Sequence, residues 1–475
     1  MLATEVDGAA DWANVRCTVA GIGVAGFAAA EALLERGASV CVIDSSDGPA
    51  QRERAEVLGI LGARILLGQQ AVLPPSDLLV VSPGLRPEAP VIAEALASGV
   101  AVWGELELAW KLRGPQAPPW LLVTGTNGKT TATLMLDSIL KAAGLRSTAA
   151  GNIGLSLVEV VTRESLDVIA VEVGAPQLPF VNSISPLAAA CLNLAEDHVD
   201  HFGSMDAYRA AKARVYQHAQ VAAVYNVDDT QTEQMVRDAD VVEGCRAVGF
   251  TLGIPRPGML GLVDDVLVDR AFIDNRQTSA QELATVEDVR PQAPHNVANA
   301  LAAAALARAY GVEPSAVREG LRAFEPAPHR ISTVATIAGV AYIDDSKATN
   351  AHAALTSLRA YSSVIWIAGG LAKGQRFEDL IASVGDRLRG VVLLGRDRAV
   401  IAEALRAWAP QVPVVEVADT APEAMHQVVR QAAALASAGD TVLLAPGCAS
   451  WDMYRDYGHR GDTFVQAVLS LPEGS

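Results

Sequence analysis

The stretch 120–131 constrains the fold of this chain more than any other part of it. The apolar run Leu121–Val123 predicts a buried strand, which leads into a loop with Gly125 at one end and Gly128 at the other. Residues 129–143 then follow helical spacing. A strand, a glycine loop and a helix N-terminus together cradle phosphate, because backbone N–H groups converge there and the helix dipole favours anions. The pattern predicts an α/β domain that binds a nucleotide phosphate.

Two side chains that follow the loop fit this interpretation. Lys129 would reach the β and γ phosphates, and the Thr130 hydroxyl would bind Mg²⁺. The two glycines are closer together than in the usual pattern, so the loop is a short variant. Gly-Lys-Thr also occurs by chance in turns, but the flanking strand and helix favour phosphate binding. The predicted nucleotide contacts are Gly125, Thr126, Asn127, Gly128, Lys129, Thr130 and Thr131.

Length and charge limit the classes of protein to consider. A chain of 475 residues exceeds what one hydrophobic core supports, so we expect roughly two to four domains. A net charge of −17 argues against nonspecific nucleic-acid binding and against an anionic membrane surface. The 5 cysteines are scattered, with no C-x-x-C pair, which indicates a reducing compartment without disulfides or a zinc site. No basic leader and no apolar run of about eighteen residues occurs, so we expect a cytoplasmic protein.

The N-terminal part contains a second pattern that is typical of nucleotide binding. Residues 15–43 read as strand, turn, helix and strand, and Gly21, Gly23 and Gly26 have the spacing G-x-G-x-x-G. Asp44 ends the next strand, about twenty residues after the turn. The spacing fits a nicotinamide or flavin dinucleotide, another nucleotide diphosphate, or a purely structural crossover. Of these we favour a nucleotide diphosphate.

Two segments rich in proline predict the domain boundaries. They lie at 113–119 and at 325–328, so we expect domains at 1–113, 114–328 and 329–475. The last domain shows short apolar strands that predict a small parallel sheet, at 364–368, 391–394 and 441–444.

Polar side chains follow the strands of the predicted central domain. Glu172 ends the strand 168–171, and His198 follows the strand 188–194. Because the ligand crevice of an open α/β sheet lies at the strand C-termini, Thr130, Glu172 and His198 can face one phosphate-bound metal.

Other polar residues leave alternatives open. Lys212 lies on a predicted helix, where it either faces solvent or is a modified or metal-associated lysine. Asn296 and Asn299 lie one turn apart on an Ala-rich helix, where they either cap the helix or contact a ligand. Asn152 lies in a loop where its amide can hydrogen-bond a substrate.

As a set, these motifs resemble the Mur ligases, the ATP-dependent amide-forming enzymes of peptidoglycan precursor assembly. The resemblance runs from about residue 19 to residue 464, and its motifs are 125–131, 193–198, 208–212 and 295–299. The segment Asp345-Ser-Lys-Ala-Thr-Asn350 resembles the members of this family that add D-glutamate. The Asp-Asn-Pro-Arg motif of the diaminopimelate-adding members is absent.

The resemblance implies an N-terminal Rossmann-like domain for UDP, a central P-loop ATPase-type domain, and a C-terminal Rossmann-like domain for the amino acid. It implies that ATP phosphorylates the carboxylate of UDP-N-acetylmuramoyl-L-alanine, and that the amine of D-glutamate attacks the acyl phosphate. Because two anions must meet, the reaction needs divalent metal and cationic side chains. We expect ATP, two Mg²⁺ ions and a monomer, with no nucleic-acid or membrane partner.

Individual roles also follow from the resemblance. Catalytic roles fall to Lys129, His198 and Lys212, the last carbamylated, and the metal ligands are Thr130, Glu172, His198 and Lys212. Further ATP contacts are Asn296, Asn299, Arg330 and Asp345. The UDP-sugar site comprises Ile22, Gly23, Val24, Ala25, Asp44, Ser45, Asn152 and Gln177. The D-glutamate site comprises Lys347, Thr349, Lys373, Ser450 and Tyr457.

One segment departs from the family pattern. Two residues after Glu172 the family has Ser-Ser-Phe-Gln-Leu, whereas this chain has Gly174-Ala-Pro-Gln-Leu178. Each lost buried hydroxyl contact to a substrate costs about 1 kcal/mol. Glycine and proline also reshape the backbone, so we expect weaker contacts with the muramoyl group here.

Three other functions remain as alternatives. Another ligase of the same fold, such as folylpolyglutamate synthase, would share the phosphate loop but lack the segment 345–350. A dinucleotide-dependent oxidoreductase would leave Lys129, His198 and Lys212 without a role. A nucleotide-binding protein without turnover stays open because of the change at 174–176.

Overall fold

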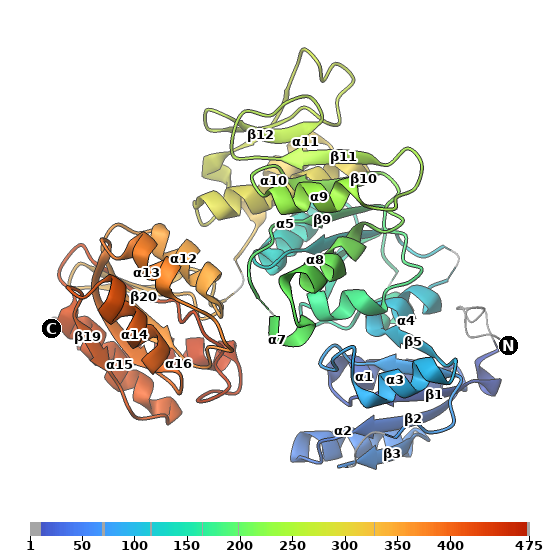
Figure 1. The fold of residues 1–475 in the computed structure, drawn as a ribbon. Coiled ribbons are helices and arrows are strands. Elements are labelled where there is room, and N and C mark those ends of the chain that lie inside the picture. The colour runs from blue at the N-terminus through green and yellow to red at the C-terminus, as the bar shows by residue number, and fades with distance from the viewer. Residues whose placement is uncertain are drawn as a thin grey trace. The chain divides into compact units, whose positions relative to one another are not determined.

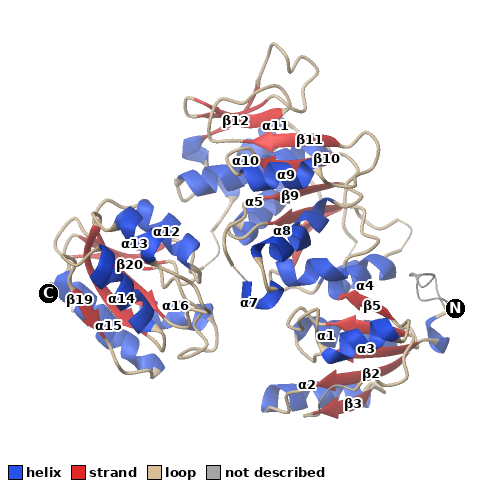
Figure 2. Ribbon diagram, viewed as in Figure 1, coloured by secondary structure: helices blue, strands red, loops and turns tan. Residues whose placement is uncertain are grey.

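The computed structural model describes residues 11–68, 72–114, 116–163, 165–197, 199–326 and 328–472. The chain divides into two compact units: Met1–Leu194 with His201–Phe324, and Ala195–Asp200 with Glu325–Ser475. The strands form sheets of 5, 9 and 6 strands, and Figure 2 shows helices alongside the strands of each sheet. This architecture confirms the predicted α/β class with three domains. The boundaries predicted at 113/114 and 328/329 remain predictions.

The first sheet is parallel and has the order β3-β2-β1-β4-β5. Its strand β4 consists of apolar residues that are all buried, as expected where helices cover both faces of a parallel sheet. Because β1 lies between β2 and β4, the strand order reverses at the C-terminal end of β1, and such switch points hold ligands. The elements are β1 (Arg16–Ala20), α1 (Val24–Glu35), β2 (Ser39–Asp44), α2 (Pro49–Ile60), β3 (Arg64–Leu67), β4 (Leu78–Val81), α3 (Pro90–Ala97) and β5 (Ala101–Gly104).

The second sheet has the order β14-β13-β12-β11-β10-β9-β6-β8-β7. Figure 1 labels four of these strands, β12, β11, β10 and β9. Its strands pair in parallel from β7 to β12, and β13 and β14 add an antiparallel extension. The strands are β6 (Trp120–Thr124), β7 (Ser147–Gly151), β8 (Val168–Glu172), β9 (Ala188–Cys191), β10 (Ala222–Asn226), β11 (Arg246–Phe250), β12 (Met259–Val263), β13 (Val266–Asp269) and β14 (Gln281–Thr285).

The helices of this part confirm two of the predicted segments. The helix predicted from Lys129 is α5, and the Ala-rich helix is α10; they pack against each other over a core of apolar side chains. The helices are α5 (Lys129–Ala142), α6 (Leu157–Arg163), α7 (Val199–Phe202), α8 (Met205–Ala213), α9 (Thr230–Arg237), α10 (Pro294–Tyr310) and α11 (Pro314–Ala323).

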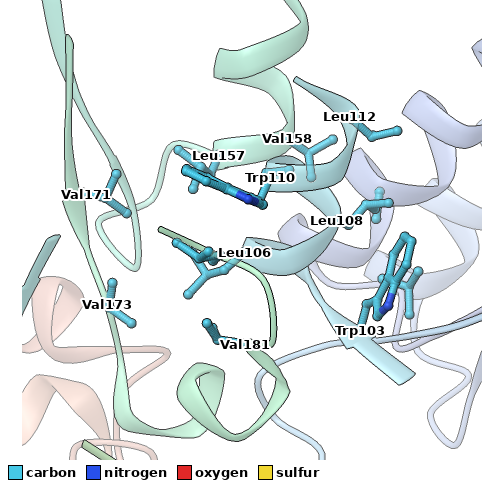
Figure 3. Packing of buried hydrophobic residues seen from close by; sticks show 14 of the residues in the cluster. Trp103, Leu106, Leu108, Trp110, Leu112, Leu157, Val158, Val171, Val173 and Val181 are labelled. Atoms are coloured by element: carbon cyan, nitrogen blue, oxygen red, sulfur yellow. The ribbon is translucent and has the colours of Figure 1, made fainter. Parts of the chain in front are cut away.

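Helix α4 (Glu105–Leu112) joins the first two sheets into one unit. The buried Glu105 carboxylate accepts hydrogen bonds from Ser156 Oγ at 2.7 Å and from the Leu157 amide at 2.9 Å. Glu107 accepts from Ser183 Oγ at 2.6 Å. Figure 3 shows apolar residues that pack around this helix, among them Leu106, Trp110, Leu157, Val158, Val173 and Val181.

The third sheet has the order β15-β16-β20-β17-β18-β19. It is parallel except for β15, which pairs antiparallel with β16. The loops after β16, β20 and β17 therefore leave the sheet next to one another. The elements are β15 (Ser332–Ile337), β16 (Val340–Asp344), α12 (Ala351–Arg359), β17 (Val364–Gly369), α13 (Glu378–Val384), β18 (Leu388–Leu394), α14 (Arg398–Trp408), β19 (Val414–Glu416), α15 (Met425–Leu435), β20 (Thr441–Leu444) and α16 (Tyr457–Leu469).

Two expectations about strands were wrong in part. The third sheet also contains β15, β16 and β19, which were not predicted, and it is not wholly parallel; β15 and β19 lack the buried apolar run that marks the inner strands. The strand predicted at 188–194 ends at Cys191, because the Asn193 side chain bonds to the phosphate loop and the Leu194 amide donates to Asp229. Among the described residues, no helix combines the length and apolar character that crossing a membrane requires.

Candidate functional site

The phosphate loop lies at the C-terminal edge of the second sheet, where β6 is flanked by β8 and β9. Asn193, just beyond β9, fixes its shape: the Asn193 Oδ1 accepts from the Asn127 amide at 2.9 Å, and its Nδ2 donates to the Asn127 carbonyl at 3.1 Å. The Asn193 carbonyl accepts from the Thr126 amide at 3.0 Å. The loop is therefore built before any ligand arrives, which lowers the entropy lost on binding.

Lys129 begins helix α5 and folds back over the loop. Its Nζ donates to the carbonyl oxygens of Gly125 at 3.0 Å and Thr126 at 2.8 Å. The ammonium group is thus held at the loop, where an incoming phosphate would offer it stronger, charged acceptors. Thr130 and Thr131, predicted to contact the nucleotide, occupy the next positions of α5 and are half-buried.

Gly128 caps α5 in a left-handed conformation, with φ of 82°. A Cβ atom here would lie 2.4 Å from Asn299 Oδ1, so Asn299 of α10 packs directly on the loop. Asn296 Nδ2 donates to the Pro291 carbonyl at 3.1 Å, and Asn299 Nδ2 lies 3.5 Å from Asn296 Oδ1. The structure therefore brings both predicted asparagines to the phosphate loop side of the sheet, and their contact with ATP stays a prediction.

We expect Gly128→Ala to weaken ATP binding by roughly tenfold or more, because a strained left-handed residue costs about 1–3 kcal/mol and the new methyl group displaces Asn299. Isothermal titration calorimetry with ATP measures the change. Gly144→Ala is the matched control, since Gly144 also has a positive φ, 78°, but a Cβ atom there meets nothing within 4 Å. Equal ATP affinity in both variants would contradict the assignment of this loop.

Lys212 of α8 is buried beneath the same loop, at 1% exposure. Its Nζ donates to the Gly125 carbonyl at 2.7 Å and lies 3.4 Å from Thr124 Oγ1. Tyr208, one turn earlier, places its hydroxyl 3.0 Å from Thr126 Oγ1. Of the two alternatives for Lys212, the solvent-facing helix position is therefore wrong, and its modification stays a prediction.

Glu172 ends β8, in register with Val123 of β6, so its carboxylate lies beside the phosphate loop. It is 2% exposed; Oε1 accepts from Asn152 Nδ2 at 2.9 Å, while Oε2 is buried with no hydrogen-bond partner among the described residues. An orphaned carboxylate oxygen is a hard oxygen donor of the kind that Mg²⁺ prefers. The residues thus fit a magnesium ion.

The other predicted metal ligand, His198, lies outside the described residues. Within the described part of the chain, no group of three or more His, Cys, Asp and Glu side chains is placed to hold a metal. A site here would depend on oxygen ligands from the ATP phosphates and from Thr130, Glu172 and a modified Lys212, which is how Mg²⁺ is commonly held at phosphate sites.

The unusual segment after Glu172 forms a short 3₁₀ helix, Ala175–Phe180. Gln177 caps it from inside, since its Oε1 accepts from the Gly174 amide at 2.8 Å. A Cβ atom at Gly174 would lie only 3.0 Å from Asn152 Oδ1. The missing side chain at this position therefore makes room for Asn152, which stays bonded to Glu172.

The glycine turn of the first sheet lies at the switch point after β1. Asp44, at the end of β2, accepts from the Ile22 amide at 2.9 Å and from the Ser46 amide at 2.8 Å. A Cβ atom at Gly26 would lie 1.8 Å from the Gly21 carbonyl oxygen, so the helix packs tightly on the turn. The other predicted UDP contacts, Gly23, Val24, Ala25 and Ser45, flank this turn and are more exposed; their roles stay predictions.

The second unit gathers most of the predicted amino-acid site where β16, β20 and β17 end. Lys347 Nζ lies 3.9 Å from the ring centroid of Tyr457, and Lys373 Nζ lies 4.2 Å from that of Trp451. The loops are joined by the Gly447 amide, which donates to the Ala348 carbonyl at 2.8 Å. The predicted residues Thr349 and Ser450 lie on the same loops.

Asp345, predicted to contact ATP, also lies in this unit, as does Arg330. Burial raises the pKa of the Asp345 carboxyl to about 6, although a hydrogen bond from Ser357 opposes the shift. The ordinary value is 3.8, so the folded protein holds this proton more tightly than the unfolded chain does. Stability should therefore fall as pH rises from about 4 through about 6, and stay lower above that.

Because asparagine does not ionise, we expect Asp345→Asn to remove the fall in stability at high pH. The free energy of unfolding at pH 8 should rise by up to about 3 kcal/mol, since one pKa unit is worth about 1.4 kcal/mol. Urea unfolding at pH 8 and pH 4 measures the difference between variant and wild type. The gain should disappear at pH 4, and a gain of equal size at both pH values would contradict the assignment.

Several residues at these sites were not assigned a role from the sequence. Arg460 of α16, 1% exposed, donates to Ser346 Oγ at 3.0 Å, to the Ser346 carbonyl at 2.8 Å and to the Cys448 carbonyl at 3.1 Å. It ties the loop after β16 to the loop after β20. Asn193 similarly shapes the phosphate loop. Asn193 could have been found from its place in the motif 193–198, which resembles the Mur ligases. Nothing in the local sequence pattern indicated a role for Arg460.

Family models cover all three sheets. "Mur ligase MurD-like, N-terminal domain" matches residues 15–104, "Mur ligase middle domain" matches 123–307, and "Mur ligase, glutamate ligase domain" matches 329–448. A solved structure, UDP-N-acetylmuramate-alanine ligase MurC from Thermotoga maritima, has a TM-score of 0.58 at 19% identity, covering 96% of this chain and 100% of that one. This likeness shows the fold.

Curated relatives match over almost the full length. The UDP-N-acetylmuramoylalanine--D-glutamate ligase of Streptomyces avermitilis is 57% identical over 97% of this chain and 99% of its own length. The protein of the same name from Streptomyces coelicolor is 56% identical, again over 97% of this chain and 99% of its own length. This chain belongs to the Mur ligase family.

Proposed function

We propose that this chain joins D-glutamate to the carboxyl group of UDP-N-acetylmuramoyl-L-alanine, consuming ATP and releasing ADP and inorganic phosphate. One observation carries the proposal: a preformed phosphate loop and a buried carboxylate with an orphaned oxygen end adjacent strands, Val123 paired with Glu172. The relatives whose printed names specify this reaction match 97% of the chain, which supports the choice of substrates. The reaction takes place in the cytoplasm, where ATP is available.

The reaction requires the γ-phosphate of ATP to approach a carboxylate of like charge. Lys129 donates to loop carbonyls in this structure, and its ammonium group would instead bind the β and γ phosphates of ATP. Thr130 and Glu172 would hold one Mg²⁺ and His198 a second, and the metal would neutralise charge on the phosphate and the carboxylate. The acyl phosphate that forms gives the carboxyl carbon a good leaving group, so the amine of D-glutamate can displace phosphate.

A carbamylated Lys212 is compatible with the hydrogen bonds around this side chain. The Nζ of a carbamate keeps one N–H, which can still donate to the Gly125 carbonyl, 2.7 Å away. The added carboxylate group would supply oxygen ligands of the kind that Mg²⁺ prefers. We propose that this anion supports the metal beside Glu172.

The other substrates occupy the remaining clusters. We assign the uridine diphosphate to the turn at 22–25 with Asp44 and Ser45, and the muramoyl side of the substrate to Asn152 and Gln177. D-glutamate is assigned to Lys347, Thr349, Lys373, Ser450 and Tyr457. Further ATP contacts fall to Asn296, Asn299, Arg330 and Asp345. These assignments follow the family resemblance, and many of the groups also lie in loops after strands, where open α/β sheets bind ligands; Asn296 and Asn299 lie on α10 instead.

A phosphate-release assay with each substrate omitted in turn tests the proposal. We expect phosphate only when ATP, UDP-N-acetylmuramoyl-L-alanine and D-glutamate are all present, and little with L-glutamate in place of D-glutamate. Phosphate release that does not depend on the nucleotide sugar would favour another ligase of this fold. ATP binding without any release would make the chain a nucleotide-binding protein.

A further inference from the structure

An exposed tryptophan lies against a lysine beside the proposed amino-acid site. Trp451, directly after Ser450, is 65% exposed, which is unusual for a large aromatic side chain. Its ring lies under Lys373, with 4.2 Å between the ring centroid and Nζ. Lys347 makes the corresponding contact with Tyr457, at 3.9 Å. Trp451 has no role in the assignments above.

The backbone around Lys373 is held in place from both sides. Leu371 and Ala449 exchange two backbone hydrogen bonds, of 2.9 and 3.0 Å, which join the loop after β17 to the loop that carries Trp451. Asp397 Oδ2 accepts from the Ala372 amide at 2.8 Å. These hydrogen bonds hold the backbone just before Lys373 next to the loop that carries Trp451.

Lys373 itself has a positive φ of 52°, and Gly374 follows with φ of 76°. A residue other than glycine in this conformation is strained, and such strain persists where neighbouring contacts determine the backbone, often at functional sites. The conformation turns Lys373 towards the loop of Trp451, where its ammonium group meets the indole ring.

The kind of partner that Lys373 has is informative. An aromatic face attracts an ammonium group through its quadrupole but leaves the positive charge intact. A carboxylate in the same place would neutralise the lysine and compete with an acidic ligand. Among the ion pairs of the described residues none involves Lys373, so the ring is the partner that this structure assigns to it.

We propose that Trp451 is a positioning residue, which holds the ammonium group of Lys373 where it pairs with a carboxylate of the acidic amino acid. The proposal rests on the proposed function, in that D-glutamate binds beside Ser450. Trp451 then sets the apparent affinity for the amino acid by limiting the conformations of Lys373, and it takes no part in the chemical step.

Steady-state kinetics of Trp451→Leu test this role. We expect KM for D-glutamate to rise about two- to fivefold, as follows from the small contribution of an exposed cation–ring contact, while kcat and KM for ATP stay within experimental error. Trp451→Phe should retain most of the affinity, because it keeps an aromatic face. Trp408→Leu, at another exposed tryptophan, 57% exposed at the end of α14, is the matched control and should leave every parameter unchanged.

A double-mutant cycle separates this role from a structural one. In a Lys373→Met background, Trp451→Leu should cause no further change in KM for D-glutamate, because the ring acts through the lysine. An equal rise in both backgrounds, or no rise in the single variant, would overturn the proposal. Wild-type protein that shows no dependence on D-glutamate would instead refute the proposed function, so the two failures are distinguishable.

Discussion

Turnover of the Lys212→Ala variant should fall by roughly a hundredfold, the upper end of the range for losing a group that supports a metal, while ATP still binds. The reason lies in the burial of this side chain under the phosphate loop, with its Nζ 2.7 Å from the Gly125 carbonyl. Phosphate release gives the rate, and calorimetric titration gives the ATP affinity. Lys141→Ala is the control, since Lys141 belongs to the same unit but has an exposed side chain, which pairs with Asp137.

The same variant distinguishes two chemical states of Lys212. If the lysine is carbamylated, added formate or acetate should restore part of the rate, because a small carboxylate replaces the lost anion. If the lysine acts as an ammonium group, a small amine such as methylamine should restore it instead. Unchanged turnover in Lys212→Ala would contradict both roles.

Replacing Arg460 by methionine should destabilise the second unit by about 2–6 kcal/mol, because each of the two buried carbonyl oxygens left without a donor costs about 1–3 kcal/mol. Burial lowers the pKa of the Arg460 guanidinium to about 10, so it is still charged at neutral pH and is stabilised by the oxygens around it. Methionine fills similar space but leaves the Ser346 and Cys448 carbonyl oxygens without their donor.

Hydrogen exchange, followed by mass spectrometry, measures this loss locally. Amide protection should drop in β16 and β20, which precede the two loops that Arg460 joins, and should persist in the sheets of the first unit. Arg455→Met is the control, because Arg455 lies nearby on an exposed position. Unchanged protection in β16 and β20 would show that Arg460 does not hold the loops together.

Local patterns in the sequence were enough to locate the phosphate loop and the glycine turn. In both places a buried apolar strand, a glycine turn and a helix follow one another within a short segment, so neighbouring residues determine the structure. Glu172 was predicted at the loop because parallel strands end at one edge of a sheet, and the register of β6 with β8 bears this out. These features depend on few long-range contacts.

Other features depend on residues far apart in the sequence. Asn193 reaches Asn127 across 66 positions, and Arg460 reaches Ser346 across 114. No periodicity or turn signal records such a contact, so the resemblance drew attention to Asn193 and nothing drew attention to Arg460. Strand β15 was missed for a related reason, since an edge strand with half-buried residues lacks a continuous apolar run.

The change at Gly174 has a structural explanation that the sequence alone did not give. The motif comparison predicted weaker contacts where Ser-Ser-Phe is replaced, and the structure places the Asn152 side chain close to the missing Cβ atom. Asn152 keeps its hydrogen bond to Glu172, and Gln177 caps the short helix that follows. The carboxylate beside the phosphate loop is thus positioned despite the altered segment.

The acyl-phosphate mechanism is tested most directly by following the oxygen atoms of the acceptor carboxylate. UDP-N-acetylmuramoyl-L-alanine labelled with ¹⁸O in its free carboxyl group is incubated with the enzyme, ATP and D-glutamate, and the released phosphate is analysed by mass spectrometry. If ATP phosphorylates that carboxylate, each phosphate acquires one oxygen from it. Phosphate without the label would contradict an acyl-phosphate intermediate.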